Sequence, residues 1–353
     1  MLTKNIDLSR KTVLITGVAG FIGANLAKRL LELVEDIRVI GIDSLNDYYD
    51  VSLKKFRLDQ IQNVLGKFVF VEGNIAEQEC VKGIFELYHP DIVVNLAAQA
   101  GVRYSIEHPD VYIQSNLVGF YNILEACRHS KDNDCEGVRH LVYASSSSVY
   151  GNNKKVPYSV EDKTDTPVSL YAATKKSNEL LAYSYSKLYD IPSTGLRFFT
   201  VYGPGGRPDM AYFNFTNKLV RGEKIKIFNY GRCKRDFTYI DDIVEGIIKV
   251  MEVSPYLDSD GVRYKVYNIG NNHPENLLDF VEVLQEELKL AGVLSNEYDF
   301  ESHKELVGMQ PGDVEVTYAD TTELEKDFGF KPDTGLKDGL RKFAKWYREY
   351  YFV

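Results

Sequence analysis

The sequence predicts an α/β fold: a Rossmann-like, doubly wound parallel sheet with a smaller C-terminal α/β domain that binds substrate. Three observations predict it. Short β-branched runs alternate with helix-length segments, a glycine-rich turn follows the first of these runs, and the regular alternation loosens after about Gly203. Regular alternation of strand and helix is typical of a parallel sheet that is covered by helices on both faces.

Short apolar runs of the length of a buried strand recur along the chain. The predicted strands are residues 12–16, 38–43, 68–72, 92–96, 141–144, 194–199 and 263–270. The clearest helical segments between them are residues 21–34, 111–129 and 169–188. We expect a large domain of residues 1–202 plus 238–272, and a smaller domain of residues 203–237 plus 273–353.

Composition excludes several classes of protein. The chain has 353 residues and a net charge of −9, which argues against a nucleic-acid surface. No stretch approaches the roughly 20 apolar residues of a membrane span, and the polar N-terminus does not resemble a signal peptide. The four cysteines show no CxxC pair, so we expect reduced thiols of a cytoplasmic protein and no metal site.

The first predicted strand runs into "TGVAGFIG", with glycines at Gly17, Gly20 and Gly23. A strand, a glycine turn and a helix in this order are typical of a site where a dinucleotide pyrophosphate meets a helix N-terminus. Asp43 ends the second strand, where a carboxylate can bind a ribose diol and would repel a 2′-phosphate. The pattern predicts NAD in preference to NADP, although a glycine-rich turn without a ligand is the alternative.

Tyr171 and Lys175 are four residues apart in a predicted helix and therefore share one face. A lysine ammonium beside a phenol lowers the pKa of the tyrosine, which would make Tyr171 a base for an alcohol proton. A surface Tyr–Lys pair is the alternative. The serine run just upstream, Ser145–Ser148, favours the catalytic interpretation.

Taken together, GxxGxxG, Asp43, "NLAAQAG", the serine run before "VYG" and YxxxK resemble the extended short-chain dehydrogenase/reductase family. Within it the chain resembles the nucleotide-sugar 4-epimerases, and most closely the UDP-glucuronate 4-epimerases, through "NDYYDVSLKKFRL", "AAQAGVRYS", "LRFFTVYGPGGRPDMA" and "RDFTYIDDIVEGI". The resemblance implies a catalytic set of Ser146, Tyr171 and Lys175. It also implies an NAD site made of Gly17, Gly20, Phe21, Ile22, Gly23, Asp43, Asn74, Ile75, Ala97, Ala98, Gln99, Tyr171 and Lys175.

The same resemblance gives the two residues after Ser146 a meaning. Sugar 4,6-dehydratases carry Asp and Glu at the positions of Ser147 and Ser148, and decarboxylating relatives carry Glu at the second position. Serine is neither a general acid nor a base near neutral pH, so these hydroxyls predict a site that binds the sugar ring without elimination. Capping of the following turn is the alternative for both residues.

The substrate residues are also implied by resemblance. Ser147, Thr200 and Arg207 would surround a sugar carboxylate, since hydroxyls and a guanidinium make strong hydrogen bonds to an anion. A surface salt bridge in a loop rich in glycine and proline is the alternative for Arg207. Other positions would hold the UDP moiety: Arg103, Arg235, Gln310 and Asp313.

The expected activity is reversible C4 epimerisation of UDP-glucuronate to UDP-galacturonate through a 4-keto intermediate and transient NADH. Epimerisation of a neutral UDP-hexose, glucose or N-acetylamino, is the enzymatic alternative, and a non-catalytic NAD-binding regulator is the alternative from another class. We also expect a homodimer that pairs segments 111–129 and 169–188, with an apolar stripe at Ile113, Leu117, Phe120 and Leu124. A stripe that faces the core of the protein is the alternative, since it would have the same spacing.

Overall fold

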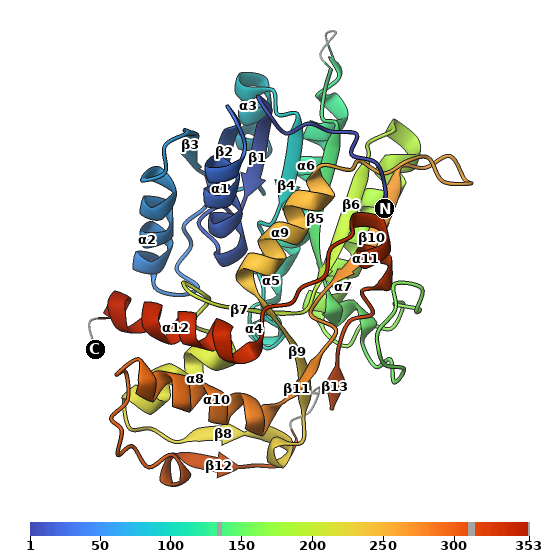
Figure 1. The fold of residues 1–353 in the computed structure, drawn as a ribbon. Helices are drawn as coiled ribbons and strands as arrows, with labels where there is room; N and C mark the ends of the chain where they lie inside the picture. The colour runs from blue at the N-terminus through green and yellow to red at the C-terminus, as the bar shows by residue number, and fades with distance from the viewer. Residues whose placement is uncertain (133–135, 310–314, 352–353) are drawn as a thin grey trace.

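The computed structural model describes residues 1–132, 136–309 and 315–351, and its centre is a seven-stranded parallel sheet (Figure 1). The strand order is β10-β6-β5-β4-β1-β2-β3. The order reverses beside β1, which leaves a crevice at the carboxyl ends of β1 and β4, where ligands bind in folds of this kind. The strands are β1 Thr12–Thr16, β2 Arg38–Asp43, β3 Lys67–Glu72, β4 Ile92–Asn95, β5 His140–Ser146, β6 Ser193–Phe198 and β10 Tyr264–Ile269.

Helices cover both faces of this sheet, so the prediction of a doubly wound fold is confirmed (Figure 1). Side chains alternate along β1: Val13 and Ile15 pack into one core cluster and Leu14 into the other. The long helices of this domain are α1 Phe21–Leu33, α2 Val51–Gln62, α3 Gln78–Tyr88, α6 Gly119–His129, α7 Leu170–Tyr189 and α9 Ile240–Met251. Among the described helices, none is long and apolar enough to cross a membrane.

The predicted helix 111–129 is interrupted. After the short helices α4 Tyr104–Glu107 and α5 Pro109–Tyr112, the backbone widens into a π-helix, η1 Ile113–Val118, before α6 begins. The buried amide of Asn116 accepts from the Gln99 backbone N–H at 2.8 Å and donates to the Gln99 carbonyl at 3.0 Å. Single π-turns of this kind often occur at functional sites, and this one fixes the chain that follows β4.

The prediction of the dimer stripe is wrong for two of its residues. Phe120 and Leu124 are 1% and 0% exposed and lie in the core. They belong to the apolar face of α6 that covers the sheet. Ile113 and Leu117 are at least partly exposed, and Tyr121 continues on the outside of α6. The alternative of a core-facing stripe therefore applies to half of the predicted set.

A second sheet is built around β9 Lys234–Tyr239, which pairs with β7 Thr200–Tyr202, β11 Pro274–Asn276 and β13 Val316–Thr317. Helices cover it, and a separate pair of strands lies at the far end of the molecule (Figure 1). The predicted domain boundaries at residues 202/203, 237/238 and 272/273 stay a prediction. The remaining elements are α8 Ala211–Val220, β8 Ile225–Ile227, α10 Leu277–Leu290, β12 Lys304–Leu306, α11 Thr322–Phe328 and α12 Leu336–Tyr351.

An aromatic cluster joins α2 to α8 and α12. In Figure 1, α12 lies beside the end of α2. Trp346, the single tryptophan of the chain, stacks on Tyr350 with ring centroids 5.2 Å apart. Its centroid lies 6.4 Å from that of Phe56 on α2 and 5.8 Å from that of Phe213 on α8. Burial of such large rings stabilises the contact between the two parts of the molecule.

Candidate active site

A cavity of about 490 Å³ lies at the carboxyl ends of β1, β4 and β5. Every residue predicted to hold NAD lines it, and so do Ser146, Ser147, Ser148, Thr200 and Arg207. The structure therefore brings the predicted cofactor, catalytic and carboxylate residues to one cavity. Its size is in the range of small-molecule sites.

Two of the predicted UDP residues, Arg103 and Arg235, lie outside the lining of this cavity. The Arg103 guanidinium lies 5.6 Å from the centroid of the Phe228 ring, and Arg235 donates to the backbone carbonyls of Lys234 and Glu315. Neither lines the cavity, and their binding roles stay predictions. Gln310 and Asp313 lie outside the described residues.

The glycine turn has the geometry that a dinucleotide needs. A Cβ atom on Gly17 would lie 2.8 Å from the Ala97 backbone nitrogen, and one on Gly23 would lie 2.4 Å from the Gly17 oxygen. Helix α1 begins at Phe21 after Gly20, with no side-chain cap and no acidic residue in its first turn as described. Its first N–H groups are therefore available to a phosphate.

Asp43 completes this half of the site. It is 9% exposed, and its two carboxylate oxygens accept from the backbone N–H groups of Ala19 at 3.1 Å and Leu45 at 2.9 Å. These bonds hold the acid at the end of β2 with oxygen lone pairs left for a ribose diol. The residues present fit NAD.

Tyr171, Ser146 and Lys175 meet where β5 ends against α7. A hydrogen bond from the Ser146 hydroxyl lowers the pKa of Tyr171, but burial of the phenol is the larger effect and raises that pKa overall. Burial also lowers the pKa of Lys175 to about 8, and its Nζ donates to the Ala144 carbonyl at 2.8 Å. The prediction that Lys175 lowers the pKa of Tyr171 is wrong in this structure, because burial raises that pKa and the positive charge that opposes the rise is that of Arg207.

The serines have different contacts. Ser145 donates at 2.7 Å to Glu179, which forms a buried ion pair with Arg197. Ser146 accepts from the Ser148 backbone N–H at 3.2 Å and caps the following 3₁₀ turn, η3 Ser147–Tyr150. The capping predicted as an alternative for Ser147 and Ser148 is therefore made by Ser146, while those two line the cavity.

Arg207 forms a salt bridge, as the alternative for this residue predicted, and its partner is Asp209. Its Nε donates to Asp209 Oδ1 at 3.0 Å and its Nη2 to Asp209 Oδ2 at 2.7 Å. The Tyr48 hydroxyl also donates to Asp209, at 3.4 Å. Asp209 raises the pKa of Arg207 against the opposing effect of burial, so the guanidinium stays charged at the cavity wall.

A family model described as GDP-mannose 4,6-dehydratase matches residues 14–343. The chain belongs to this family. This family is part of the extended short-chain dehydrogenases/reductases, as the motifs of the sequence indicated.

Two relatives and one solved structure are similar to nearly the whole chain. The chain is 50% identical to Protein CapI of Staphylococcus aureus, with 96% of this chain and 99% of that protein covered. It is 44% identical to UDP-glucuronate 4-epimerase 4 of Arabidopsis thaliana, covering 96% of this chain and 76% of that protein. A crystal structure of UDP-glucuronic acid 4-epimerase from Bacillus cereus, in complex with UDP-glucuronic acid and NAD, matches with a TM-score of 0.82 at 30% identity, covering 96% and 100% of the chains.

The sequence analysis did not identify Tyr48, which lines the cavity. It also did not identify two residues behind the cavity wall: Asp209, which pairs with Arg207, and Arg57, which donates to the carbonyls of Ala19, Gly205 and Gly206. All three are polar side chains at positions where no periodicity or spacing marks them. Tyr48 and Arg57 lie inside "NDYYDVSLKKFRL", which pointed to the epimerases without showing what each residue does. Asp209 is two residues after Arg207, so a local ion pair was the available signal.

Proposed function

We propose that the protein interconverts UDP-glucuronate and UDP-galacturonate by inverting C4 of the sugar, with NAD as a retained cofactor. The observation that carries this proposal is that one cavity is lined by both Tyr171 with its Ser146 hydrogen bond and Arg207 with Thr200 and Ser147. The first set suits proton transfer at a sugar hydroxyl, and the second suits a sugar carboxylate. Relatives that have this activity span nearly the whole chain.

The residues of the site have distinct tasks in this reaction. NAD⁺, when bound, supplies a hydride acceptor that also returns the hydride. Tyr171 takes the proton of the C4 hydroxyl and later returns it to the C4 oxygen, once hydride has returned to the opposite face of C4, while Ser146 hydrogen-bonds the same oxygen. Lys175, four residues from Tyr171 on α7 and hydrogen-bonded to the Ala144 carbonyl near the end of β5, would hold the cofactor beside the reacting groups. The 4-keto sugar turns about its diphosphate between the two hydride transfers, so the net redox change is zero.

Hydroxyls next to the ring explain why the sugar is not dehydrated. Ser147 and Ser148 line the cavity where an eliminating enzyme needs an acid and a base. The 4-keto intermediate of a uronate is a β-keto acid, and Arg207, Thr200 and Ser147 would hold its carboxylate near the ring plane. In that orientation the carboxyl bond does not overlap the ketone π system, which disfavours loss of CO₂.

One observation favours the neutral-hexose alternative. Asp209 already neutralises Arg207 through two hydrogen bonds, so an uncharged sugar would not leave an isolated buried cation. Incubation of the protein with UDP-glucuronate and with UDP-glucose, followed by sugar analysis, decides between them. We expect UDP-galacturonate from the first substrate without added NAD where cofactor co-purifies, and no product from Tyr171→Phe. Turnover of UDP-glucose alone would contradict the carboxylate assignment.

We further propose that the protein is a cytoplasmic homodimer. Its surface carries apolar side chains on the two helical segments predicted to pair: Ile113 and Tyr121 are 37% and 45% exposed, and Leu180 and Tyr183 are 61% and 40% exposed. Such a patch on neighbouring helices is typical of a helix-to-helix interface. The exposed set, and not the core residues Phe120 and Leu124, is the surface that a second copy would cover.

A further inference from the structure

Arg57 on α2 is a buried cation that the proposed chemistry does not use. Its residue is 3% exposed, and it does not line the cavity. Across the described part of the chain, its guanidinium bonds to three backbone carbonyls and one phenol and forms no ion pair. A buried charge without a counter-ion is costly, so its retention calls for a function that depends on its shape or its charge.

The partners of Arg57 lie in the two halves of the site. On one side, Nη1 donates to the Ala19 carbonyl at 3.0 Å, and Ala19 lies in the glycine turn between Gly17 and Gly20. On the other side, Nε and Nη2 donate to the carbonyls of Gly205 at 2.8 Å and Gly206 at 2.9 Å, immediately before Arg207 in the chain. We call the glycine turn of residues 17–20 the cofactor turn and residues 205–207 the carboxylate arm. One planar guanidinium therefore holds the cofactor turn and the carboxylate arm together.

The Ala19 peptide is fixed at both ends. Its N–H donates to Asp43, the acid predicted to bind the ribose, and its carbonyl accepts from Arg57. Any shift of this turn on cofactor binding must therefore change the hydrogen bonds of Arg57. A planar guanidinium with several fixed donors transmits such a shift better than a flexible ammonium would.

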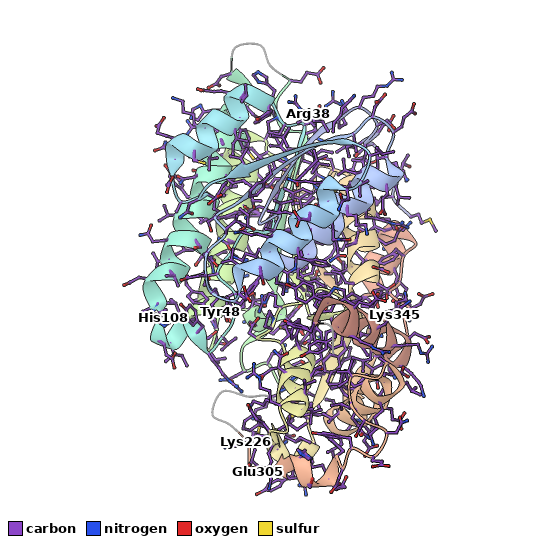
Figure 2. All side chains as sticks on the ribbon, turned by 90° about the vertical axis from the view of Figure 1, so that its left-hand side faces the viewer. Arg38, Tyr48, His108, Lys226, Glu305 and Lys345 are labelled. Carbon is purple, nitrogen blue, oxygen red and sulfur yellow. The ribbon has the colours of Figure 1, made fainter. Side chains whose placement is uncertain are left out.

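The carboxylate arm is held unevenly. A Cβ built on Gly206 would lie 1.6 Å from the Tyr212 hydroxyl, whereas a Cβ built on Gly205, which has φ +65°, would meet no atom of the described residues within 4 Å. Gly205 is therefore the part of the arm whose position depends most on the Arg57 hydrogen bond. Adjacent tyrosines extend the connection: Tyr49 accepts from Arg57 at 2.7 Å, while Tyr48 donates to Asp209, the partner of Arg207. In Figure 2, Tyr48 lies between the end of the molecule that carries Arg38 and the end that carries Lys226 and Glu305.

We propose that Arg57 is a positioning residue that couples binding of the dinucleotide to binding of the substrate carboxylate. This rests on the proposed function, because it requires a uronate whose carboxylate meets Arg207. Each ligand orders one side of the same hydrogen-bonded bridge, so the second ligand has less disorder to remove. Coupling of this kind is reciprocal, and it distinguishes UDP-glucuronate from UDP-glucose, which has no carboxylate to hold the arm.

The test follows cofactor release from the reduced holoenzyme. Protein carrying NADH is mixed with excess NAD, and loss of bound-NADH fluorescence is timed in the presence of UDP, UDP-glucose or UDP-glucuronate. NADH cannot oxidise the C4 alcohol, so no turnover precedes release. We expect UDP-glucuronate to slow release at least about fivefold more than UDP-glucose does in the wild type, the lower end of typical coupling between sites.

Variants locate the effect. In Arg57→Lys the rates of NADH release with UDP-glucuronate and with UDP-glucose should differ by no more than about twofold. Tyr49→Phe removes one acceptor of Arg57 and should give an intermediate difference. Lys55→Met removes an exposed cation from the same helix and should behave as the wild type. Thermal melts verify folding, and Tyr49→Phe provides the test if Arg57→Lys does not fold.

Two results would overturn the inference. The first is a wild type that releases NADH equally fast with both sugars. The second is a pair of variants, Arg57→Lys and Tyr49→Phe, that change release by the same factor with all three nucleotides, as a purely structural bridge would. Failure of the wild type to epimerise UDP-glucuronate is a different outcome, which contradicts the proposed function and is measured separately.

Discussion

At the scale of single residues, four neighbouring serines make different contacts. Ser145 supports a buried ion pair, Ser146 faces the phenol of Tyr171, and Ser147 and Ser148 line the cavity. All four serines line the cavity, and the partner that each hydroxyl meets distinguishes them. Identical side chains therefore have different chemistry according to the group that each one contacts.

Ser146→Ala should slow epimerisation by about two orders of magnitude and move its pH dependence. The Ser146 hydroxyl lowers the pKa of Tyr171, so its removal leaves burial unopposed and raises that pKa further. Because the base acts when deprotonated, the rising limb of rate against pH should shift to higher pH. Initial rates on UDP-glucuronate across the pH range measure the shift, and an unmoved limb with a lower plateau would show that Ser146 affects binding alone.

Lys175→Met should abolish turnover and yet stabilise the nucleotide-free protein at pH 7. Burial lowers the pKa of Lys175 to about 8, from 10.5 in an unfolded chain. Between those values the unfolded chain binds the proton more tightly, so the ammonium destabilises the fold fully below pH 8 and less as pH rises to 10.5. Once the loss of the Lys175 hydrogen bond to Ala144 is subtracted, we expect Lys175→Met to raise the free energy of unfolding by about 1–2 kcal/mol.

Melting of both proteins at pH 7 and at pH 10 tests this prediction. The stabilisation by Lys175→Met should be largest at pH 7 and should shrink at pH 10. An equal difference at the two values would mean that the lysine titrates at its ordinary pKa in the fold.

Arg207→Ala should do more than weaken substrate binding. The carboxylate of the 4-keto intermediate would lose its strongest partner, and truncation of a charged hydrogen bond costs about 1.5–3 kcal/mol. That changes the balance between hydride return and loss of CO₂ by roughly ten- to a hundredfold. Product analysis should find a UDP-pentose or UDP-4-keto-pentose that the wild type does not make. A raised Michaelis constant with no pentose would mean that Arg207 does not control the carboxylate orientation.

At the scale of elements, the strands and the glycine turn could be predicted because their causes are local. Runs such as Arg38–Asp43 are apolar and β-branched, and the structure has that strand at the same residues. The π-helix at Ile113–Val118 could not be predicted, since its cause is the hydrogen bonding of Asn116 with Gln99 across the fold. The same holds for Arg57, whose partners lie 38 and about 150 positions away along the chain.

The loop before Arg207 gives a prediction at this scale. A Cβ on Gly206 would lie 1.6 Å from the Tyr212 hydroxyl, so Gly206→Ala should displace the loop and raise the Michaelis constant for UDP-glucuronate about tenfold or more. Tyr212→Phe in the same chain removes the clashing oxygen and should restore part of the loss. Gly205→Ala is the matched control, because it meets no atom within 4 Å and should cost only the backbone strain of its positive φ, about 1 kcal/mol.

Steady-state kinetics of the three variants test the loop. Recovery by Tyr212→Phe in the Gly206→Ala background is the diagnostic result. Equal Michaelis constants for Gly205→Ala and Gly206→Ala would indicate general loosening of the loop in place of a specific clash.

At the scale of the whole molecule, the chain weaves between two sheets, since β7 and β9 pair in the second sheet while β10 returns to the first. This topology places the cofactor turn and the carboxylate arm on either side of one cavity. The family and the main sheet were predicted correctly from motifs and alternation. The order of strands in the second sheet was not, because short strands of this kind carry little periodic signal.

The proposed dimer is tested through its exposed stripe. Leu180→Glu places a charge in the middle of the apolar patch on α7, where Leu180 is 61% exposed. Light scattering at micromolar concentration should report about twice 40.2 kDa for the wild type and a monomer for the variant. Leu65→Glu, at a leucine that is 96% exposed in the loop before the edge strand β3, should leave the mass unchanged. A monomeric wild type would remove the dimer from the proposal.

The aromatic cluster around Trp346 has an optical consequence. Because the chain has a single tryptophan, its intrinsic emission arises from one indole, and that indole is packed against Phe56, the neighbour of Arg57 on α2. Closure of the two halves of the molecule around a nucleotide sugar would change the polarity and quenching around this ring. A change of Trp346 emission on mixing with a nucleotide sugar would therefore report movement of α12 against α2, and stopped-flow fluorescence can time it without any attached dye.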